Sequence, residues 1–105
     1  MKILFDHGTL APLRHYLTEH LVDLAEGKGC ETLENGKLIR RAEETGYRVI
    51  VTTDKNMQYQ QNLKGRSLAI VVLQTPAWPK VCLRAEEIRI AIKESLPGEV
   101  TEVPI

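Results

Sequence analysis

Two aspartates directly follow apolar segments that the sequence marks as strands. Asp6 comes after Lys2–Phe5, and Asp54 ends the run Arg48–Thr53. Sites in open parallel α/β sheets form outside the carboxyl ends of the strands, so the two carboxylates converge if these strands are neighbours. Two close carboxylates repel each other unless a positive charge lies between them, and a hard divalent cation such as Mg²⁺ supplies that charge. The pattern therefore predicts a metal site at one edge of a parallel sheet.

Three further residues could complete such a site. Asn56 follows Asp54 by two positions and offers a neutral oxygen, while Glu34 and Asn35 stand at the start of an expected helix. A metal held by these groups would activate a water molecule and clamp a phosphodiester. The alternative is that each aspartate caps the turn or helix that follows it, which is a common role after a strand.

The segments between these residues alternate between strand and helix patterns. Unbroken apolar runs such as Val49–Val51 are typical of strands that are covered on both faces. Alternation of such strands with helices predicts an α/β fold with a mainly parallel central sheet. The expected strands are Lys2–Phe5, His20–Leu24, Arg48–Thr53, Leu68–Leu73 and, at an edge, Glu99–Val103.

The expected helices follow from caps and from apolar residues at helical spacing. Asn35 is a good N-cap, and Gly46 is placed to end the helix that it begins. The buried stripes should contain Leu10, Leu13 and Leu17 after Thr9 and Pro12, then Leu38, Ile39 and Ala42, and then Ala85, Ile88, Ile92 and Leu96 within Arg84–Leu96. Residues 57–63 form a short helix in this interpretation, whereas 25–33 and the segment with Trp78 between Pro76 and Pro79 are loops. His15 and His20 are assigned as helix and surface residues.

Length and composition describe one ordinary globular domain, residues 1–105. Fourteen basic and fourteen acidic side chains give a net charge near zero, which argues against binding of nucleic acid through a uniform positive field. No apolar run is long enough to span a membrane, and the N-terminus does not resemble a signal peptide. Cys30 and Cys82 form neither a CxxC pair nor a metal-ligand spacing. We therefore expect a cytoplasmic protein without a membrane partner.

At these residues the chain resembles the small PIN-like proteins of the DUF5615 type. The resemblance covers about residues 1–75, and its most specific part is the strand with Thr53, Asp54 and Asn56 together with the segment Tyr59–Leu63. The segments that carry it are Met1–Asp6, Asn35–Leu38, Val49–Asn56, Tyr59–Leu63 and Ala69–Leu73.

That resemblance implies a PIN-like three-layer α/β/α fold and a Mg²⁺- or Mn²⁺-dependent ribonuclease. The family is regarded as a group of toxin ribonucleases, often encoded beside a small antitoxin-like protein. The resemblance matches Asp6 and Asp54 with residues of the acidic metal cluster of PIN domains. The chain differs from many relatives at His7, Lys37 and Asn56, where they have acids. RNA is the implied substrate, and the oligomeric state stays open, with a dimer as one option.

Two other functions remain as alternatives. A PIN-like domain that has lost acids could act as a binding module for protein or nucleic acid, through Tyr59–Leu63 and Trp78. A phosphoacceptor domain of the receiver type would also place an acid after the first strand and another, Asp54, after a later one. Receivers need an acidic pair at the first position and a lysine after the last strand, whereas this chain has Asp6-His7 and no lysine in 99–105.

Overall fold

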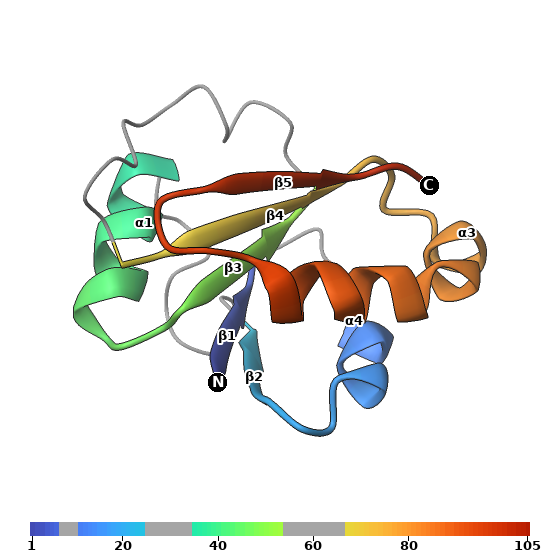
Figure 1. Ribbon diagram of the computed structural model, residues 1–105, viewed down its shortest axis with the longest axis horizontal. Coiled ribbons are helices and arrows are strands. Elements are labelled where there is room, and N and C mark those ends of the chain that lie inside the picture. Colours follow the sequence, from blue (N-terminus) through green and yellow to red (C-terminus); the bar gives the residue numbers. More distant parts are fainter. Residues whose placement is uncertain (7–10, 25–34, 54–66) are drawn as a thin grey trace.

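The computed structural model describes residues 1–6, 11–24, 35–53 and 67–105. Within these ranges, five strands form a single parallel sheet in the order β2-β1-β3-β4-β5 (Figure 1). The strands are β1 (Lys2–Phe5), β2 (Leu21–Leu24), β3 (Val49–Thr52), β4 (Ala69–Leu73) and β5 (Val100–Val103). All five expected strands are thus present, each within a residue of its predicted bounds, and β5 is an edge strand as predicted.

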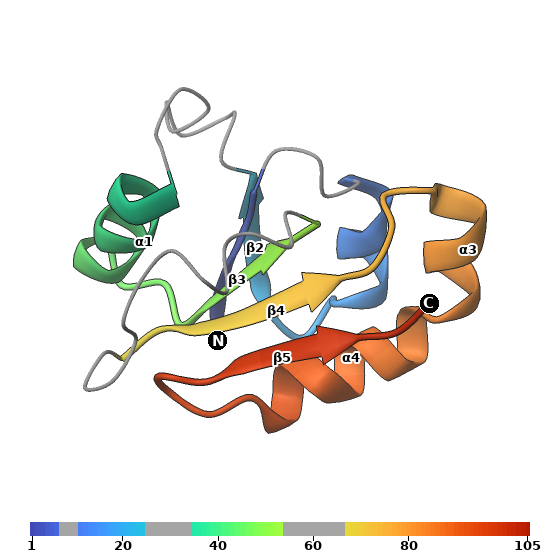
Figure 2. The ribbon, with the colours of Figure 1, turned by 90° about the horizontal axis from the view of Figure 1, so that it is seen from above.

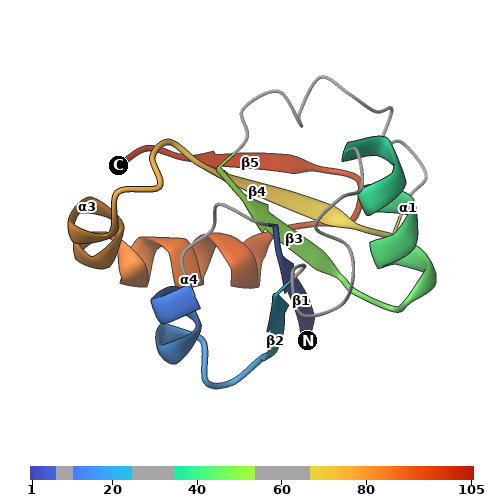
Figure 3. The ribbon, with the colours of Figure 1, turned by 180° about the vertical axis from the view of Figure 1, so that it is seen from behind.

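Helices cover both faces of this sheet. α1 (Asn35–Glu44) packs on one face, and the 3₁₀ helix η1 (Ala11–Tyr16), α3 (Trp78–Leu83) and α4 (Ala85–Glu94) pack on the other. Figures 2 and 3 show the sheet between these two layers. The described residues therefore form a three-layer α/β/α arrangement. None of the helices in these ranges is long and apolar enough to cross a membrane.

The two cores explain why the central strands are apolar at every position. Side chains alternate between the faces of a strand, so Val49 and Val51 face α4 while Ile50 faces α1. The same alternation runs through β4, where Ala69–Leu73 is buried at all five positions. A strand with helices on both sides has no solvent face, and an unbroken apolar run is the result.

Helix α1 begins and ends where the sequence places it. Leu38, Ile39 and Ala42 are buried against the sheet. At its C-terminal end the backbone NH of Tyr47 donates to the Ala42 carbonyl at 3.0 Å, and Gly46 takes a φ of 91°. Only glycine adopts this left-handed conformation without strain, so Gly46 stops the helix as predicted.

The segment around Trp78 is a helix rather than the predicted loop. Trp78 is the first residue of α3, and Pro79 occupies its first turn. A proline is tolerated there because the first-turn NH groups have no partner within the helix. The NH groups of Lys80 and Val81 both donate to the Ala77 carbonyl at 3.0 Å. Two prolines around an aromatic residue therefore mark a helix start here.

A second correction concerns the last helix. Ala85, Ile88 and Ile92 are buried on one side of α4 as predicted, but Leu96 is 56% exposed. The helix ends at Glu94, and Ser95 is already extended with a ψ of 141°. Leu96 is therefore no longer in phase with the buried stripe. The predicted loop 25–33, the predicted helix 57–63, Thr9 and Leu10 lie outside the described residues.

Candidate functional site

Asp6 continues the hydrogen bonding of β1 beyond the end of the strand. The register pairs Phe5 with Val51, and the Asp6 backbone NH donates to the Val51 carbonyl at 3.0 Å. This places Asp6 beside Thr52 at the carboxyl edge of the sheet. The first strand and the strand before Asp54 are therefore neighbours, which is the condition for the two aspartates to share a site.

The Asp6 carboxylate is buried and is held by a neighbouring hydroxyl group. Asp6 is 5% exposed and Thr52 is fully buried. The Thr52 hydroxyl donates to Asp6 Oδ2 at 2.9 Å, across the boundary between β1 and β3. Leu4 and Ile50, two residues earlier on these strands, belong to the core under α1. Alternation therefore places both side chains on the α1 side of the sheet.

The strand order makes this boundary the topological switch point of the sheet. In the order β2-β1-β3-β4-β5, the chain leaves β1 toward β2 on one side and later returns to β3 on the other. The intervening helices, η1 and α1, cover opposite faces. This is the flavodoxin-like order, in which ligands bind outside the carboxyl ends of the two strands at the switch point. Asp6 lies at that point.

The other predicted site residues are described only in part. Asn35 is the first residue of α1, at the end of the helix that is farther from the start of β3. The first turn of α1 contains no acidic residue, in keeping with Lys37 at that position. Asp54, Asn56, Glu34 and His7 lie outside the described residues. The predicted proximity of the Asp6 and Asp54 carboxylates, and capping by either residue, therefore stay predictions.

The chemistry of the described site is that of one fixed carboxylate. Mg²⁺ is typically bound by one or two carboxylates, with water and substrate phosphates completing its octahedron. Asp6 suits such a cation, because its oxygens are hard ligands and its position is fixed by Thr52. In the described part of the chain, no three His, Cys, Asp or Glu side chains gather around a point where they could bind a metal. A third carboxylate, histidine or cysteine ligand beside Asp6 would therefore have to include residues outside this part of the chain, such as Asp54.

Thr52 is the site residue that sequence reasoning missed. It is the polar member of the run Val49–Thr52, all of which is buried. A threonine at the end of an apolar strand looks like ordinary strand composition, because threonine favours strands. The signal that could have found it is register, since pairing β1 with β3 sets Thr52 opposite the first residue after Phe5.

Comparisons with known proteins add no relative. No family model matches the chain, and neither the curated proteins nor the solved structures contain a match. The site and the residues of this chain are therefore what bears on its function.

Proposed function

We propose that this protein is a metal-dependent ribonuclease of PIN-like type, acting as the toxin of a toxin–antitoxin pair. The observation that supports it best is the buried Asp6 carboxylate at the carboxyl edge of β1 and β3, fixed by the Thr52 hydroxyl at 2.9 Å. Asp54 follows β3 in sequence by two positions and is the proposed second acid. Asn56, Glu34 and Asn35 are the proposed auxiliary ligands.

The chain's residues have simple roles in this proposal. Asp6 and Asp54 hold Mg²⁺ or Mn²⁺ through carboxylate oxygens, and Thr52 keeps the Asp6 carboxylate in one orientation. The bound cation supplies activation of a water molecule and neutralisation of the phosphodiester charge. Burial of Asp6 strengthens its interaction with a cation, because water screens the two charges less. With few acids available, binding is expected to be weak, with Mn²⁺ bound more tightly than Mg²⁺.

The test is cleavage of single-stranded RNA by purified protein in Mn²⁺. Asp6→Asn and Asp54→Asn should each abolish cleavage and metal binding, because the amide loses the negative charge that holds the cation. Asp23→Asn is the matched control, since Asp23 lies on β2 and accepts a hydrogen bond from the Tyr47 hydroxyl at 2.6 Å. Asp23→Asn should cleave like the unmodified protein. Equal activity in all three variants would identify a contaminating nuclease and would refute the proposal.

The second candidate function is a binding module on the same fold. The first turn of α1 contains no acidic residue, whereas the resemblance to PIN-like proteins implies a catalytic acid in that turn. This difference favours the binding module. Trp78 is half-buried, and its ring centroid lies 6.1 Å from that of Tyr16. In a binding module, Trp78→Ala or Tyr59→Ala should weaken partner binding while Asp6→Asn leaves it unchanged, because aromatic residues dominate interface energies. Folded protein that cleaves no RNA with either metal would favour this candidate.

The strand order also bears on the receiver-type alternative. Receivers share the flavodoxin-like order, and Asp54 follows β3 as their phosphoacceptor does. The residue that directly follows β5 is Pro104, however, where a receiver needs its lysine. Asp6 is also followed by His7 and not by a second acid. The ribonuclease proposal is therefore preferred to the receiver alternative. Phosphorylation of Asp54 by a small phosphodonor would reverse this preference.

A further inference from the structure

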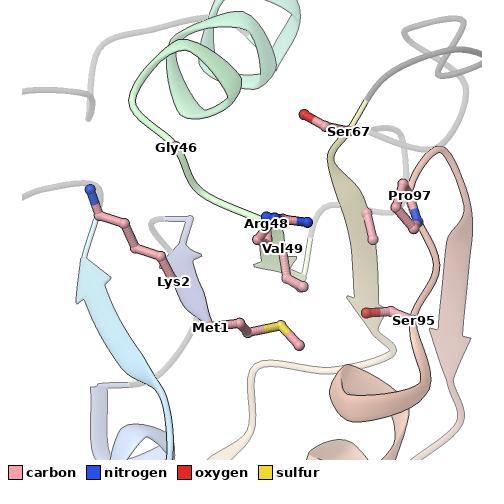
Figure 4. Close-up of a pocket in the computed structure, with 9 residues that line it drawn as sticks. Met1, Lys2, Gly46, Arg48, Val49, Ser67, Ser95 and Pro97 are labelled. Carbon is pink, nitrogen blue, oxygen red and sulfur yellow. The ribbon is translucent and has the colours of Figure 1, made fainter.

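A pocket of about 310 Å³ opens at the amino-terminal edge of the sheet, opposite the Asp6 edge. Its polar lining consists of Lys2, Arg48, Ser67 and Ser95, which come from the start of β1, the approaches to β3 and β4, and the end of α4 (Figure 4). Four separate segments thus contribute to one cavity. The parallel sheet brings them together because every strand begins at this edge.

The charge of this lining is positive. Lys2 and Arg48 line the pocket, and no aspartate or glutamate does. None of the ion pairs among the described residues involves Arg48, which is exposed. The Glu43 carboxylate accepts a hydrogen bond from the Ser67 backbone NH, a part of the lining, at 3.1 Å. No side-chain hydrogen bond between Arg48 and another described residue is present either, so within the described part of the chain its guanidinium donors can serve a ligand.

Lys2 is held in place at the border of the pocket, with its amine directed away from Arg48 (Figure 4). Its Nζ donates to the Thr45 carbonyl at 3.1 Å and lies 4.5 Å from the centre of the Tyr47 ring. An ammonium group has three donors, so two remain after the bond to Thr45. The cation–π contact and the hydrogen bond restrict this long side chain, which lowers the entropy cost of using it to bind an anion.

The rest of the lining indicates more than a bare ion. Met1, Val49 and Pro97 give the pocket an apolar wall (Figure 4). Its volume is at the lower end of the range for sites that hold small organic molecules, about 300–1,000 Å³. The Ser95 hydroxyl donates to the Ile92 carbonyl at 2.6 Å, so its oxygen remains an acceptor for a ligand hydroxyl. A ligand with an anionic group, a hydroxyl group and a small apolar surface would therefore find a matching partner for each in this pocket.

We propose that this amino-edge pocket binds the phosphate monoester of a small organic molecule, with Arg48 on the phosphate and Lys2 adding positive charge to the lining. The planar guanidinium fork of arginine matches two phosphate oxygens, which makes Arg48 the principal anchor. A nucleoside monophosphate and a sugar phosphate share this chemistry. The site does not depend on the proposed ribonuclease activity, since its residues lie at the opposite edge of the sheet from Asp6.

Titration by isothermal calorimetry and by amide chemical shifts tests the proposal, with EDTA present to remove divalent metal. The probes are uridine 5′-monophosphate, glucose 6-phosphate, inorganic phosphate and uridine. At least one organic phosphate should bind and shift the amides of Gly46, Val49 and Ala69, which border the pocket. Which of the two binds identifies the source. Uridine alone binding, inorganic phosphate binding as tightly as the esters, or no binding by any probe would overturn the proposal.

Variants locate the binding. Arg48→Gln should weaken it by about tenfold or more, the usual cost of losing charge-assisted hydrogen bonds. Arg48→Lys should recover only part of it, because lysine keeps the charge without the fork. Arg40→Gln is the matched control, since Arg40 is exposed on α1 and does not line the pocket. Unchanged binding in Arg48→Gln would overturn the proposal, as would binding lost in Asp6→Asn. RNA cleavage can fail in either case without affecting this result.

Discussion

The hydrogen bond between Thr52 and Asp6 can be removed with little change in shape. Thr52→Val replaces the hydroxyl by a methyl group and keeps the β-branched side chain, so strand propensity is retained. The bond that is lost measures 2.9 Å and ends on a buried carboxylate. Hydrogen bonds to charged groups contribute about 1.5–3 kcal/mol, and the additional buried methyl returns about 0.8 kcal/mol. We expect the free energy of unfolding to fall by about 1–2 kcal/mol.

Urea unfolding at pH 7, followed by circular dichroism, measures this change directly. In a thermal scan the same loss should lower Tm by about 4–8 °C for each kcal/mol in a domain of this size. Thr53→Val is the matched control, since Thr53 is the next residue along and is only half-buried. The control should change the free energy of unfolding by less than about 0.5 kcal/mol. Thr52→Val as stable as the unmodified protein would refute the reasoning.

A double-mutant cycle shows whether the loss comes from this pair. Asp6→Asn keeps an oxygen that can accept from the Thr52 hydroxyl but removes the charge. The cost of Thr52→Val should then fall to about 0.5–1.5 kcal/mol, the range for neutral hydrogen bonds. An unchanged cost in the Asp6→Asn background would mean that the Thr52 hydroxyl stabilises the fold through another group.

Three further predictions test the fold. Gly46→Ala should cost about 1–2 kcal/mol, because φ is 91° there while a Cβ would meet no atom within 4 Å, so chemical unfolding measures the backbone strain alone. Ile92→Ala should cost about 2–5 kcal/mol by the same measurement, with Leu96→Ala near neutral because that side chain is mostly exposed. Burial first, and then the amino group of Met1, keep the pKa of His20 below its usual value near 6.5. The unfolded chain therefore takes up this proton more readily, so stability should fall as pH drops below about 6.5, and the loss should be smaller in His20→Gln when melting is followed from pH 7 to 5.

The sheet was predictable because its strands carry the strongest signals in the chain. A run such as Ala69–Leu73 is short and rich in β-branched residues, which favours a buried strand over a helix, and helical spacing between the strands implies parallel pairing. The ends of α4 and α3 were less predictable. Leu96 continues the helical spacing in sequence after the helix has ended at Glu94, and Pro79 breaks helices everywhere except in a first turn. His20 was assigned to the surface although its side chain is 8% exposed, because a single histidine carries no burial signal.

The two candidate sites differ in how much the sequence could reveal. Asp6 was found because an acid directly after an apolar strand is a local pattern, and β1 and β3 need only be neighbours for it to matter. The amino-edge pocket has no such pattern, since Lys2, Arg48 and Ser95 are separated by dozens of residues. Each is an ordinary surface residue by itself. Strand order and register bring them together, and these were not available before the sheet was known.

Stability and metal binding together separate the two roles that Asp6 can have. If Asp6 only caps the turn after β1, Thr52→Val lowers the free energy of unfolding. Neither the unmodified protein nor this variant then binds Mn²⁺. If Asp6 is a metal ligand, Thr52 orients the carboxylate that binds the cation, and loss of a hydrogen bond that orients a metal ligand typically costs 10–100-fold in metal affinity. The variant retains every charged group of the site, so a weaker affinity for Mn²⁺ would arise from orientation alone. Calorimetric titration of Mn²⁺ into the unmodified protein, Thr52→Val and Thr53→Val therefore distinguishes a ligand from a structural aspartate before any RNA is added.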